Sequence, residues 1–415
     1  MLNILFVHQN FPGQFRHLAA FLSENPKNRV VAIGDINEAG KRFKIPGVKL
    51  CCYESPPKTS ASTHHYIRDF EKGVRRGQQV CRLALKLKQE GFTPDVIVCH
   101  PSWGDGLYLK DVFPDAKLLH YFEFFYRSQG ADLNFDPEFM SDLDENLKVR
   151  TRNAIQLLSL ADADWGLSPT RWQWQQNPPE FRSIISVIFD GINTEEIRPN
   201  PLVSLNLTGY GTLTKADEVI TFINRGLEPY RGVHTFIRAL PEILRRRPNA
   251  VVIIVGSDEV SYGKSLKEGT YRQKYLAEIA GTKGLERVFF VGHLPRDQLT
   301  SVLQLSAVHV YLTYPFVLSW SMLEAMSAGA LVVGSRTQPV QEIIEHGRNG
   351  LLVDFFNPLE LADAVDNVLT HPDRMSALSE EARRTIQQQY DLKTVCLPQQ
   401  LELIDQLQNN EIPKI

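Results

Sequence analysis

Short apolar runs that alternate with helical patterns are the feature of this sequence that most restricts its fold. Each run is bounded by turn residues, as expected for strands that are buried on both faces of a parallel sheet. A helical pattern follows the first run, through Phe15, Leu18 and Leu22. The first half of the chain is therefore predicted to be a wound α/β unit. Its predicted strands cover residues 2–7, 30–33, 48–52, 96–99 and 117–121, with a long helix at 66–89.

A second series of the same kind begins after residues 198–214, where Pro, Gly, Asn and Thr cluster. Because one core rarely grows beyond about 250–300 residues, a chain of 415 residues is expected to form two domains. We predict a first domain at 1–205, a second at 206–385, and a C-terminal helix within 386–415 that packs on the first. Wound sheets bind ligands at the carboxyl ends of their strands, so a cleft between the domains is expected to hold the site. The second series has predicted strands at 219–224, 250–255, 288–291, 307–312 and 331–333, and helices at 233–247, 271–280, 297–305, 321–328 and 358–370.

The composition is that of a globular protein, with 43% hydrophobic and 22% charged residues. A formal net charge of −3 argues against nucleic acid as the main partner. The five cysteines show no metal-ligand spacing, and no basic-then-apolar leader precedes the first run, so we expect a cytoplasmic protein. No apolar run approaches the roughly 20 residues that cross a bilayer, so any membrane contact is expected to be peripheral.

Two arginines follow the first predicted strand of the second domain. Arg225 lies at the strand end, and Arg231 and Gly232 precede a predicted helix. Two guanidinium groups aimed at one point suit a diphosphate, because guanidinium is permanently charged and binds phosphate oxygens in bidentate fashion. The alternative is that both are solvated loop arginines.

One carboxylate, Glu324, lies in an otherwise apolar stretch and is predicted to fall in the first two turns of a helix. Backbone amides near Leu318 and Ser319, at the start of that helix, suit an anion, and a nearby carboxylate can accept hydrogen bonds from sugar hydroxyls. A glutamate is rarely buried without a partner, so the apolar surroundings favour a functional role. The alternative is a helix-start glutamate that the helix dipole stabilises.

The stretch Ser-Met-Leu-Glu-Ala-Met-Ser-Ala-Gly-Ala-Leu-Val-Val, residues 321–333, resembles the signature of the family 4 (group 1) retaining glycosyltransferases. The resemblance covers the whole second domain and is weaker in the first, where residues 188–193 are similar to a family motif. It implies the GT-B fold, with two Rossmann-like domains that face a cleft. It also implies transfer from a nucleotide diphosphate sugar, with Arg225, Arg231 and Gly232 near the diphosphate and Glu324 near the ribose. No metal or other cofactor is expected.

The sequence departs from that family at one acidic position. The family has a glutamate eight positions before the one that Glu324 matches, and here that position is Phe316. The resemblance therefore indicates a subgroup that lacks the first glutamate and holds the donor sugar with other groups. The second basic residue is also Arg231 rather than the family's lysine.

Further candidates come from other strand ends. Gly13 lies where the family's first glycine-bearing loop approaches a substrate, and the alternative is an ordinary turn glycine. His120 is our first choice for a group that contacts the reacting sugar, with Glu123 as the alternative residue and a structural histidine as the alternative role. His100 is a further, weaker candidate. His293 lies where the family's backbone meets the nucleotide base, and a plain loop histidine is the alternative.

Residues 72–88 form a basic amphipathic pattern with no acidic residue. Such a helix suits an anionic membrane surface, near a lipid-linked acceptor. The alternative, which is the more common case, is a solvated helix face packed on its own domain. The basic residues are Lys72, Arg75, Arg76, Arg82, Lys86 and Lys88.

We therefore expect a metal-independent glycosyltransferase of the hexosyltransferase type, active in polysaccharide biosynthesis. Its donor is expected to be a uridine or guanosine diphosphate sugar, and its acceptor a hydroxyl of a glycan, a lipid-linked molecule or a small molecule. The pair Asp162 and Asp164 has metal-motif spacing but lacks supporting ligands. The alternatives are a nucleotide-sugar epimerase of the same fold and a nucleotide-sugar-binding protein without catalysis. The expected location is cytoplasmic, with peripheral contact to the inner face of the membrane.

Overall fold

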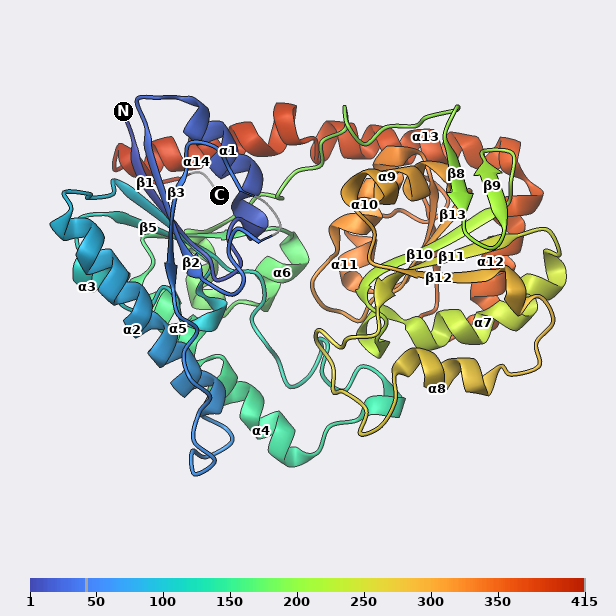
Figure 1. Ribbon diagram of the computed structural model, residues 1–415, viewed down its shortest axis with the longest axis horizontal. Helices are drawn as coiled ribbons and strands as arrows, with labels where there is room; N and C mark the ends of the chain where they lie inside the picture. Colours follow the sequence, from blue (N-terminus) through green and yellow to red (C-terminus); the bar gives the residue numbers. More distant parts are fainter. Residues whose placement is uncertain (42–43, 414–415) are drawn as a thin grey trace. The chain divides into compact units, whose positions relative to one another are not determined.

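The computed structural model describes residues 1–41 and 44–413 and divides into two compact units. Unit 1 comprises Met1–Gly191 and Lys393–Ile415, and unit 2 comprises Ile192–Leu392 (Figure 1). The boundary expected after residue 205 lies inside unit 2. The stretch expected to be a linker, 198–214, contains an antiparallel hairpin of β8 (Ser204–Leu207) and β9 (Gly211–Thr214), with β8 packed against a helix of the same unit.

Within the described residues, unit 1 holds a sheet of seven strands in the order β3-β2-β1-β4-β5-β6-β7. All neighbouring pairs are parallel. The central strands of this sheet are covered on both faces. Their sequences are therefore continuous apolar runs without polar alternation. The strands are β1 (Asn3–Val7), β2 (Arg29–Asp35), β3 (Lys49–Tyr53), β4 (Val96–Cys99), β5 (Lys117–Tyr121), β6 (Trp165–Ser168) and β7 (Ile185–Val187).

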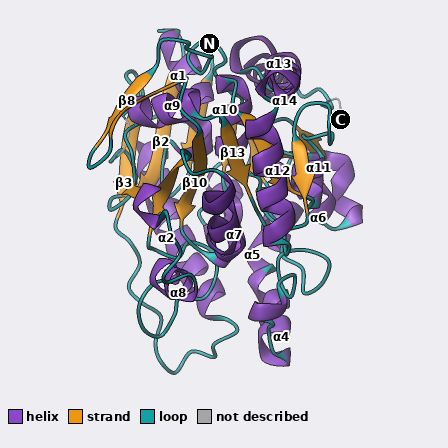
Figure 2. Cartoon of the chain, turned by 90° about the vertical axis from the view of Figure 1, so that its right-hand side faces the viewer, coloured by secondary structure: helices purple, strands orange, loops and turns teal. Residues whose placement is uncertain are grey.

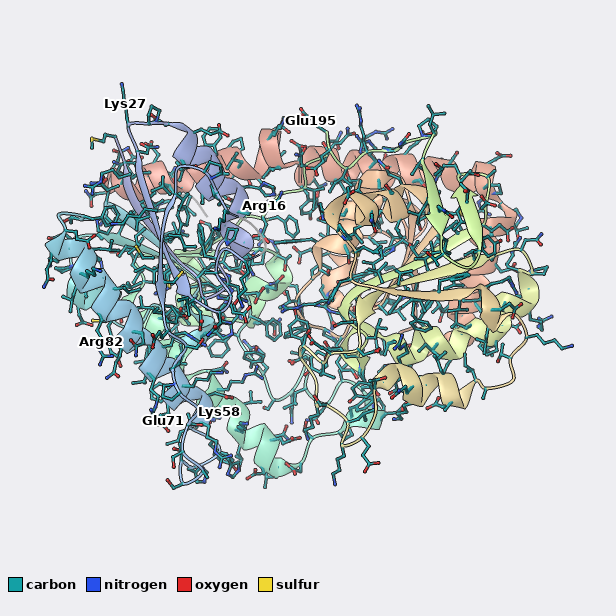
Figure 3. The ribbon with its side chains drawn as sticks, in the orientation of Figure 1. Arg16, Lys27, Lys58, Glu71, Arg82 and Glu195 are labelled. Carbon is teal, nitrogen blue, oxygen red and sulfur yellow. The ribbon has the colours of Figure 1, made fainter. Side chains whose placement is uncertain are left out.

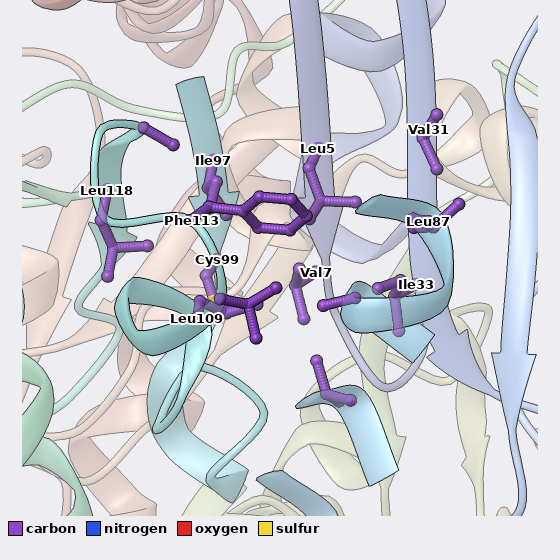
Figure 4. Close-up of a cluster of buried hydrophobic side chains, with 14 of the residues drawn as sticks. Leu5, Val7, Val31, Ile33, Leu87, Ile97, Cys99, Leu109, Phe113 and Leu118 are labelled. Carbon is purple, nitrogen blue, oxygen red and sulfur yellow. The ribbon is translucent and has the colours of Figure 1, made fainter. Parts of the chain in front are cut away.

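Helices of unit 1 bury their apolar sides on this sheet. Leu5, Ile33 and Ile97 of the strands pack with Leu87 and Phe113 on one face (Figure 4). The C-terminal helix α14 contacts both α1 and β4, so the end of the chain belongs to the first unit. The α-helices are α1 (Arg16–Glu24), α2 (Arg68–Gln89), α3 (Leu109–Val112), α4 (Leu143–Arg152), α5 (Ala154–Asp162), α6 (Arg171–Gln176) and α14 (Leu397–Gln408).

Unit 2 holds a second parallel sheet, of six strands in its described residues, in the order β12-β11-β10-β13-β14-β15. Its central strands are again continuous apolar runs with almost no exposed surface. The strands are β10 (Val219–Gly226), β11 (Val251–Ser257), β12 (Val288–Gly292), β13 (Val308–Tyr311), β14 (Leu331–Ser335) and β15 (Leu351–Val353).

Helices α7 and α12 lie side by side on the sheet of unit 2 (Figure 2). Helix α10 contacts β13, β14, α9 and α13, which is why nearly all of its residues are buried. The α-helices of this unit are α7 (Val233–Arg246), α8 (Tyr271–Glu278), α9 (Arg296–Leu305), α10 (Trp320–Ala328), α11 (Gln338–Gln341), α12 (Pro358–Thr370) and α13 (Pro372–Gln389).

No helix among residues 1–41 and 44–413 is both long and apolar enough to cross a membrane.

Candidate functional site

Polar side chains follow three neighbouring strands of unit 1. His8 comes directly after β1, His100 directly after β4, and Glu123 two residues after β5. These strands are adjacent in the order β1-β4-β5, and the direction of winding reverses between β1 and β4. Because the carboxyl ends of parallel strands meet at one edge, and because ligands of wound sheets bind at such a reversal, this edge is the candidate site of unit 1.

Hydrogen bonds connect His8 and Glu123 through Gln14. The Nε2 of His8 lies 2.8 Å from Oε1 of Gln14, and Nε2 of Gln14 donates to Oε1 of Glu123 at 2.8 Å. The backbone N–H of Asn10 donates to Nδ1 of His8 at 2.9 Å. Burial, with a smaller contribution from the neighbouring His100, lowers the pKa of His8 to about 3. His8 is therefore neutral at physiological pH.

Gly13 allows the loop after β1 to pass directly over His8. Its φ is +47°, and a Cβ atom at this position would lie 2.5–2.9 Å from three atoms of the His8 ring. Such distances are not tolerated, so the residue before Gln14 must be glycine. The structure thus assigns Gly13 a packing role on His8, and its expected role near a substrate stays a prediction.

His100 is completely buried within an aromatic group. Its ring stacks on Trp103 with centroids 4.5 Å apart and lies 5.0 Å from the ring of His8. Its Nε2 is 3.6 Å from Oε2 of Glu123, which is longer than a hydrogen bond. Glu123 itself is partly exposed, with 28% of its side-chain surface accessible. Of the three strand-end groups, Glu123 is therefore the one whose side chain reaches the surface.

The structure changes the order of preference between His120 and Glu123. His120 is the fourth residue of β5 and has no exposed surface, with its ring 2.6 Å from the position of a Cβ at Gly106. Burial lowers its pKa to about 3, so it is neutral. A side chain inside the core does not suit contact with a sugar, because it faces away from solvent. Glu123, the alternative residue, takes the first place among the candidates for that role.

In unit 2, the two expected arginines have different surroundings. Arg225 lies near the end of β10, and its side chain is exposed and makes no hydrogen bond or ion pair with any residue that the structure describes. Arg231 is 5% exposed. Its Nη1 donates to Oγ1 of Thr313 and to the carbonyl oxygen of Val317, both at 2.9 Å. Arg231 therefore binds the loop after β13, and Arg225 is the cation presented to solvent.

Gly232 provides the left-handed backbone that starts α7 directly after Arg231. Its φ is +67°, and a Cβ there would lie 2.3 Å from Cβ of Leu312. Both facts exclude a larger residue. Because Leu312 directly follows β13, Gly232 lets the two loops at the carboxyl ends of β10 and β13 lie against each other.

Glu324 lies in the second turn of α10 and is almost fully buried, as its apolar neighbours predicted. Its partner is Arg296, the first residue of α9, whose Nη2 lies 2.7 Å from Oε1 of Glu324. The side chain of Arg296 is 41% exposed and that of Glu324 is 7% exposed. The ion pair thus has one buried and one solvated end, which satisfies the requirement that a buried carboxylate be paired.

The backbone amides of Leu318 and Ser319, expected to bind an anion, differ in whether they already donate a hydrogen bond within the protein. The N–H of Ser319 donates to Oη of Tyr311 at 2.8 Å, so this amide is engaged within the protein. The amide of Leu318 has no hydrogen-bond partner among the described residues. Ser319 is the N-cap of α10, and its side chain accepts from the N–H of Ser321. Of the two amides, that of Leu318 fits the expected role better.

Phe316 packs in a cluster of aromatic side chains from three loops. Its ring centroid is 5.4 Å from that of Tyr230 and 5.0 Å from that of Tyr262, both in edge-to-face geometry. Tyr230 also lies 4.7 Å from Tyr314, and the guanidinium of Arg231 lies 5.2 Å from the ring of Tyr262. A carboxylate at position 316 would be buried among these rings, which explains why an aromatic residue suits this chain.

The remaining candidates are distributed over both units. His293 directly follows β12 and is exposed. In α2, Arg75 pairs with Glu71, Arg76 lies 4.0 Å from the buried Asp105, and Lys88 donates to the carbonyl oxygen of Val112. Lys72, Arg82 and Lys86 are exposed, and Arg82 extends from the outer side of α2 (Figure 3). Half of the basic pattern thus has intramolecular partners, and membrane contact stays a prediction.

Sequence reasoning missed His8, Gln14 and Arg296. His8 follows a predicted strand in the same way as His100, so the rule that singled out strand ends could have found it. Gln14 carries no signal by itself, because its role depends on groups from two other loops. Arg296 was placed just before its helix, and nothing in the sequence relates it to Glu324.

Two family models match the chain in succession. A model described as "Glycosyl transferase family 4 group" matches residues 26–197, and one described as "Glycosyl transferases group 1" matches residues 211–385. The chain belongs to the group 1 glycosyltransferases. Within this family, the second match contains Arg225, Arg296 and Glu324, and the first contains His100 and Glu123.

Curated relatives of this group 1 glycosyltransferase are distant. A putative glycosyltransferase, YtcC of Bacillus subtilis, is 26% identical over 219 residues, or 50% of this chain and 51% of the relative. The D-inositol 3-phosphate glycosyltransferase of Corynebacterium urealyticum is 29% identical over 202 residues, or 48% of this chain and 46% of the relative. The chain thus spans about half the length of the curated relatives it matches.

Solved structures share the fold over nearly the whole chain. Sucrose-phosphate synthase from Thermosynechococcus elongatus has a TM-score of 0.75 at 16% identity, covering 99% of this chain and 100% of that one. HepE of Anabaena, solved with UDP-glucose, has a TM-score of 0.66 at 16% identity, covering 98% and 100%. Together with the two wound parallel sheets, these likenesses show that this group 1 glycosyltransferase has the GT-B fold.

Proposed function

We propose that the protein is a retaining glycosyltransferase that moves a sugar from a nucleotide diphosphate donor to an acceptor hydroxyl. The observation that carries the proposal is the pair Arg225 and Glu324 within the segment that matches the group 1 model. One is a solvent-exposed cation and the other a buried carboxylate, and they belong to the neighbouring strand–loop–helix segments of β10 and β13. The acceptor is a glycan, a lipid-linked molecule or a small molecule, as in polysaccharide biosynthesis.

In this proposal, unit 2 binds the nucleotide. Arg225 and the Leu318 amide neutralise the diphosphate, and their charge stabilises the leaving group as the bond to the sugar breaks. Glu324 accepts hydrogen bonds from the ribose hydroxyls, and Arg296 holds its carboxylate in place until the nucleotide arrives. His293 lies beside the base. No metal and no other cofactor is part of the proposal, because these residues supply the positive charge.

Unit 1 contributes the group that contacts the reacting sugar. We assign this role to Glu123, because its carboxylate is partly exposed at the sheet edge whereas His120 is buried. Phe316 cannot hold the sugar by hydrogen bonds, so in this proposal other polar groups bind its hydroxyls.

The proposed donor is a uridine or a guanosine diphosphate sugar. The structure of HepE contains UDP-glucose, and a relative from Mycobacterium tuberculosis, 27% identical over 49% of this chain, is named as a GDP-mannose-dependent mannosyltransferase. Both names concern those proteins, and they support a screen of the two donor types. A bound donor raises the melting temperature by an amount set by its concentration relative to Kd.

The decisive experiment follows donor turnover and transfer in the full chain. Arg225→Ala and Glu324→Ala are expected to abolish donor hydrolysis and transfer, while Arg245→Ala, which removes an exposed arginine at the end of α7, serves as the matched control. Full turnover in both site variants would remove the assigned site. An isomerised donor formed without any acceptor would instead show an epimerase.

The buried Phe316 favours a second candidate function, a nucleotide-sugar-binding protein without catalysis. This function predicts a stabilising donor and no turnover with any acceptor tested. Replacement of Phe316 by Glu separates the two, because the variant would gain activity only if the other catalytic groups are already in place.

A further inference from the structure

The side-chain amide of Gln14 makes hydrogen bonds at both of its ends, and the function proposed above uses neither. Its oxygen faces His8 after β1, and its nitrogen donates to Glu123 after β5. Gln14 and Glu123 are separated by 109 positions in the sequence. The loops after β1 and β5 are therefore far apart along the chain. The contact therefore exists only because β1 and β5 end at the same edge of the sheet.

One backbone N–H group determines which atom donates in each hydrogen bond between His8, Gln14 and Glu123. The N–H of Asn10 donates to Nδ1 of His8, so Nδ1 is an acceptor and the neutral ring carries its proton on Nε2. That proton points at Gln14, which must therefore present its carbonyl oxygen to His8 and its NH₂ group to Glu123. An amide turned the other way would place two donors against each other at His8.

We propose that Gln14 is a positioning residue that holds the carboxylate of Glu123 in one orientation, and that the tautomer of His8 determines which face Gln14 presents. This inference rests on the proposed function, in which Glu123 contacts the reacting sugar. A charge-assisted hydrogen bond from a neutral amide orients a carboxylate without neutralising it. Gly13 contributes to the same arrangement, because a glycine lets the loop cross the His8 ring and place Gln14 between His8 and Glu123.

A purely structural role for Gln14 makes different predictions from a positioning role. A structural residue affects stability in the same way whether or not Glu123 is present. A positioning residue acts through Glu123, so its effect on the reaction vanishes when the carboxylate is removed, and its loss changes the titration of that carboxylate.

The first test measures the titration of Glu123 in the full chain by NMR, with ¹³C in the glutamate carboxyl groups and Glu123→Gln to assign the signal. Gln14→Leu removes the donor at similar volume, and we expect the midpoint to rise by about half a unit or more because a donor favours the charged form. The titratable groups near Glu123 include His100, Tyr121 and, through Gln14, His8. An unchanged midpoint would overturn the proposal.

The second test is a double-mutant cycle on sugar transfer. Gln14→Leu is expected to lower kcat on the order of tenfold with little change in the donor KM, and to have no further effect in a Glu123→Gln background. Gln78→Leu, at an exposed position of α2, is the matched control and is expected to change neither quantity. Additive losses in the cycle would assign Gln14 a structural role and contradict the proposal.

The two tests fail separately. If the wild-type protein neither transfers nor hydrolyses any donor, the proposed function is wrong, and the NMR titration still decides whether Gln14 orients Glu123. If transfer occurs but the midpoint of Glu123 is the same with and without Gln14, the function stands and the positioning role is wrong. Gln14→Ser serves as a second variant should Gln14→Leu not fold.

Discussion

At the scale of single residues, charge pairing and burial decide what each candidate can do. Glu324 is buried and paired with Arg296, whereas Arg225 is exposed and without a partner among the described residues. His120 and His309 are fully buried and neutral, with burial lowering the pKa of each to about 3. Burial and pairing, and not the residue type alone, thus decide which of these side chains is available to a ligand.

Removal of Arg296 leaves the buried carboxylate of Glu324 without its partner. We expect Arg296→Ala to lower the free energy of unfolding by about 1–2 kcal/mol, less than for a fully buried pair because the arginine is partly solvated. Urea denaturation measures this quantity. Arg296→Ala combined with Glu324→Gln is the control, and it is expected to recover part of the loss because no charge is left buried. Equal stability of the wild type and Arg296→Ala would show that the ion pair contributes nothing.

The burial of His120 predicts a pH dependence of stability. In the unfolded chain a histidine binds a proton below its ordinary pKa of 6.5, while folded His120 stays neutral down to about pH 3. The stability it contributes is therefore complete above pH 6.5 and is lost as the pH falls towards 3. Between pH 7 and pH 5 this loss amounts to about 2 kcal/mol for one histidine.

His120→Leu is expected to remove that loss and to retain sugar transfer, because the side chain has no access to a substrate. Urea midpoints at pH 7 and pH 5 measure the first effect, and the initial rate of transfer measures the second. His64→Asn, which removes the imidazole of an exposed histidine, is measured alongside as the matched variant. Loss of transfer in a folded His120→Leu protein would restore His120 as the catalytic candidate.

At the scale of elements, loops at the carboxyl ends of neighbouring strands hold one another. Arg231 binds Thr313 and Val317 in the loop after β13, and Gly232 packs on Leu312. The aromatic rings of Tyr230 and Phe316 cover the same junction. The two loops are thus held against each other. Their relative position depends on the planar guanidinium of Arg231, which can donate hydrogen bonds in several directions.

Arg231→Lys keeps the charge but loses this geometry. We expect a loss of about 2–3 kcal/mol in stability, because buried acceptors lose their donors, and weaker donor binding, because the loop after β13 moves. Chemical denaturation and a donor titration measure the two effects. The matched change Arg225→Lys, at an exposed arginine, is expected to change stability by less than about 0.5 kcal/mol. Similar losses in both variants would contradict the distinction between them.

At the scale of the whole molecule, the chain enters unit 2 after Gly191 and returns to unit 1 at Lys393. Unit 1 is therefore completed only by the C-terminal helix α14, whose buried residues Leu403, Ile404 and Leu407 belong to its core. Folding of unit 1 thus depends on residues that follow the whole of unit 2 in the sequence.

Leu403→Ala is expected to destabilise unit 1 by about 2–5 kcal/mol, because it leaves a cavity where α14 packs. Hydrogen exchange with mass spectrometry assigns the loss to a unit, and we expect faster exchange in α1 and β4 with no change in β10 or β13. The exposed neighbouring change Glu402→Ala is the control. Faster exchange in the strands of unit 2 alone would contradict the assignment of α14 to unit 1.

Much of the fold follows from the sequence because parallel strands buried on both faces are continuous apolar runs. The predicted strands at 96–99 and 117–121 have the same bounds as β4 and β5. The hairpin of β8 and β9 was not predicted, because its residues are mostly exposed and rich in turn formers. Strands β6 and β7 were not among the predicted strands either, although both are largely buried, because runs of four and three residues carry little periodic pattern.

The sequence by itself determined the two wound sheets, the loops at their strand ends, and the residue types that nucleotide-sugar chemistry needs. Only the tertiary structure decided that Arg231 is buried while Arg225 is exposed, that Glu324 pairs with Arg296, and that Gln14 connects His8 to Glu123. The physical reason is that strand and helix patterns are local properties of the chain, whereas burial and hydrogen bonding depend on residues far apart in it. Because ligands of wound sheets bind at the carboxyl ends of the strands, the sequence limits the candidate site to the loops that follow them. Packing decides which side chains of those loops are exposed.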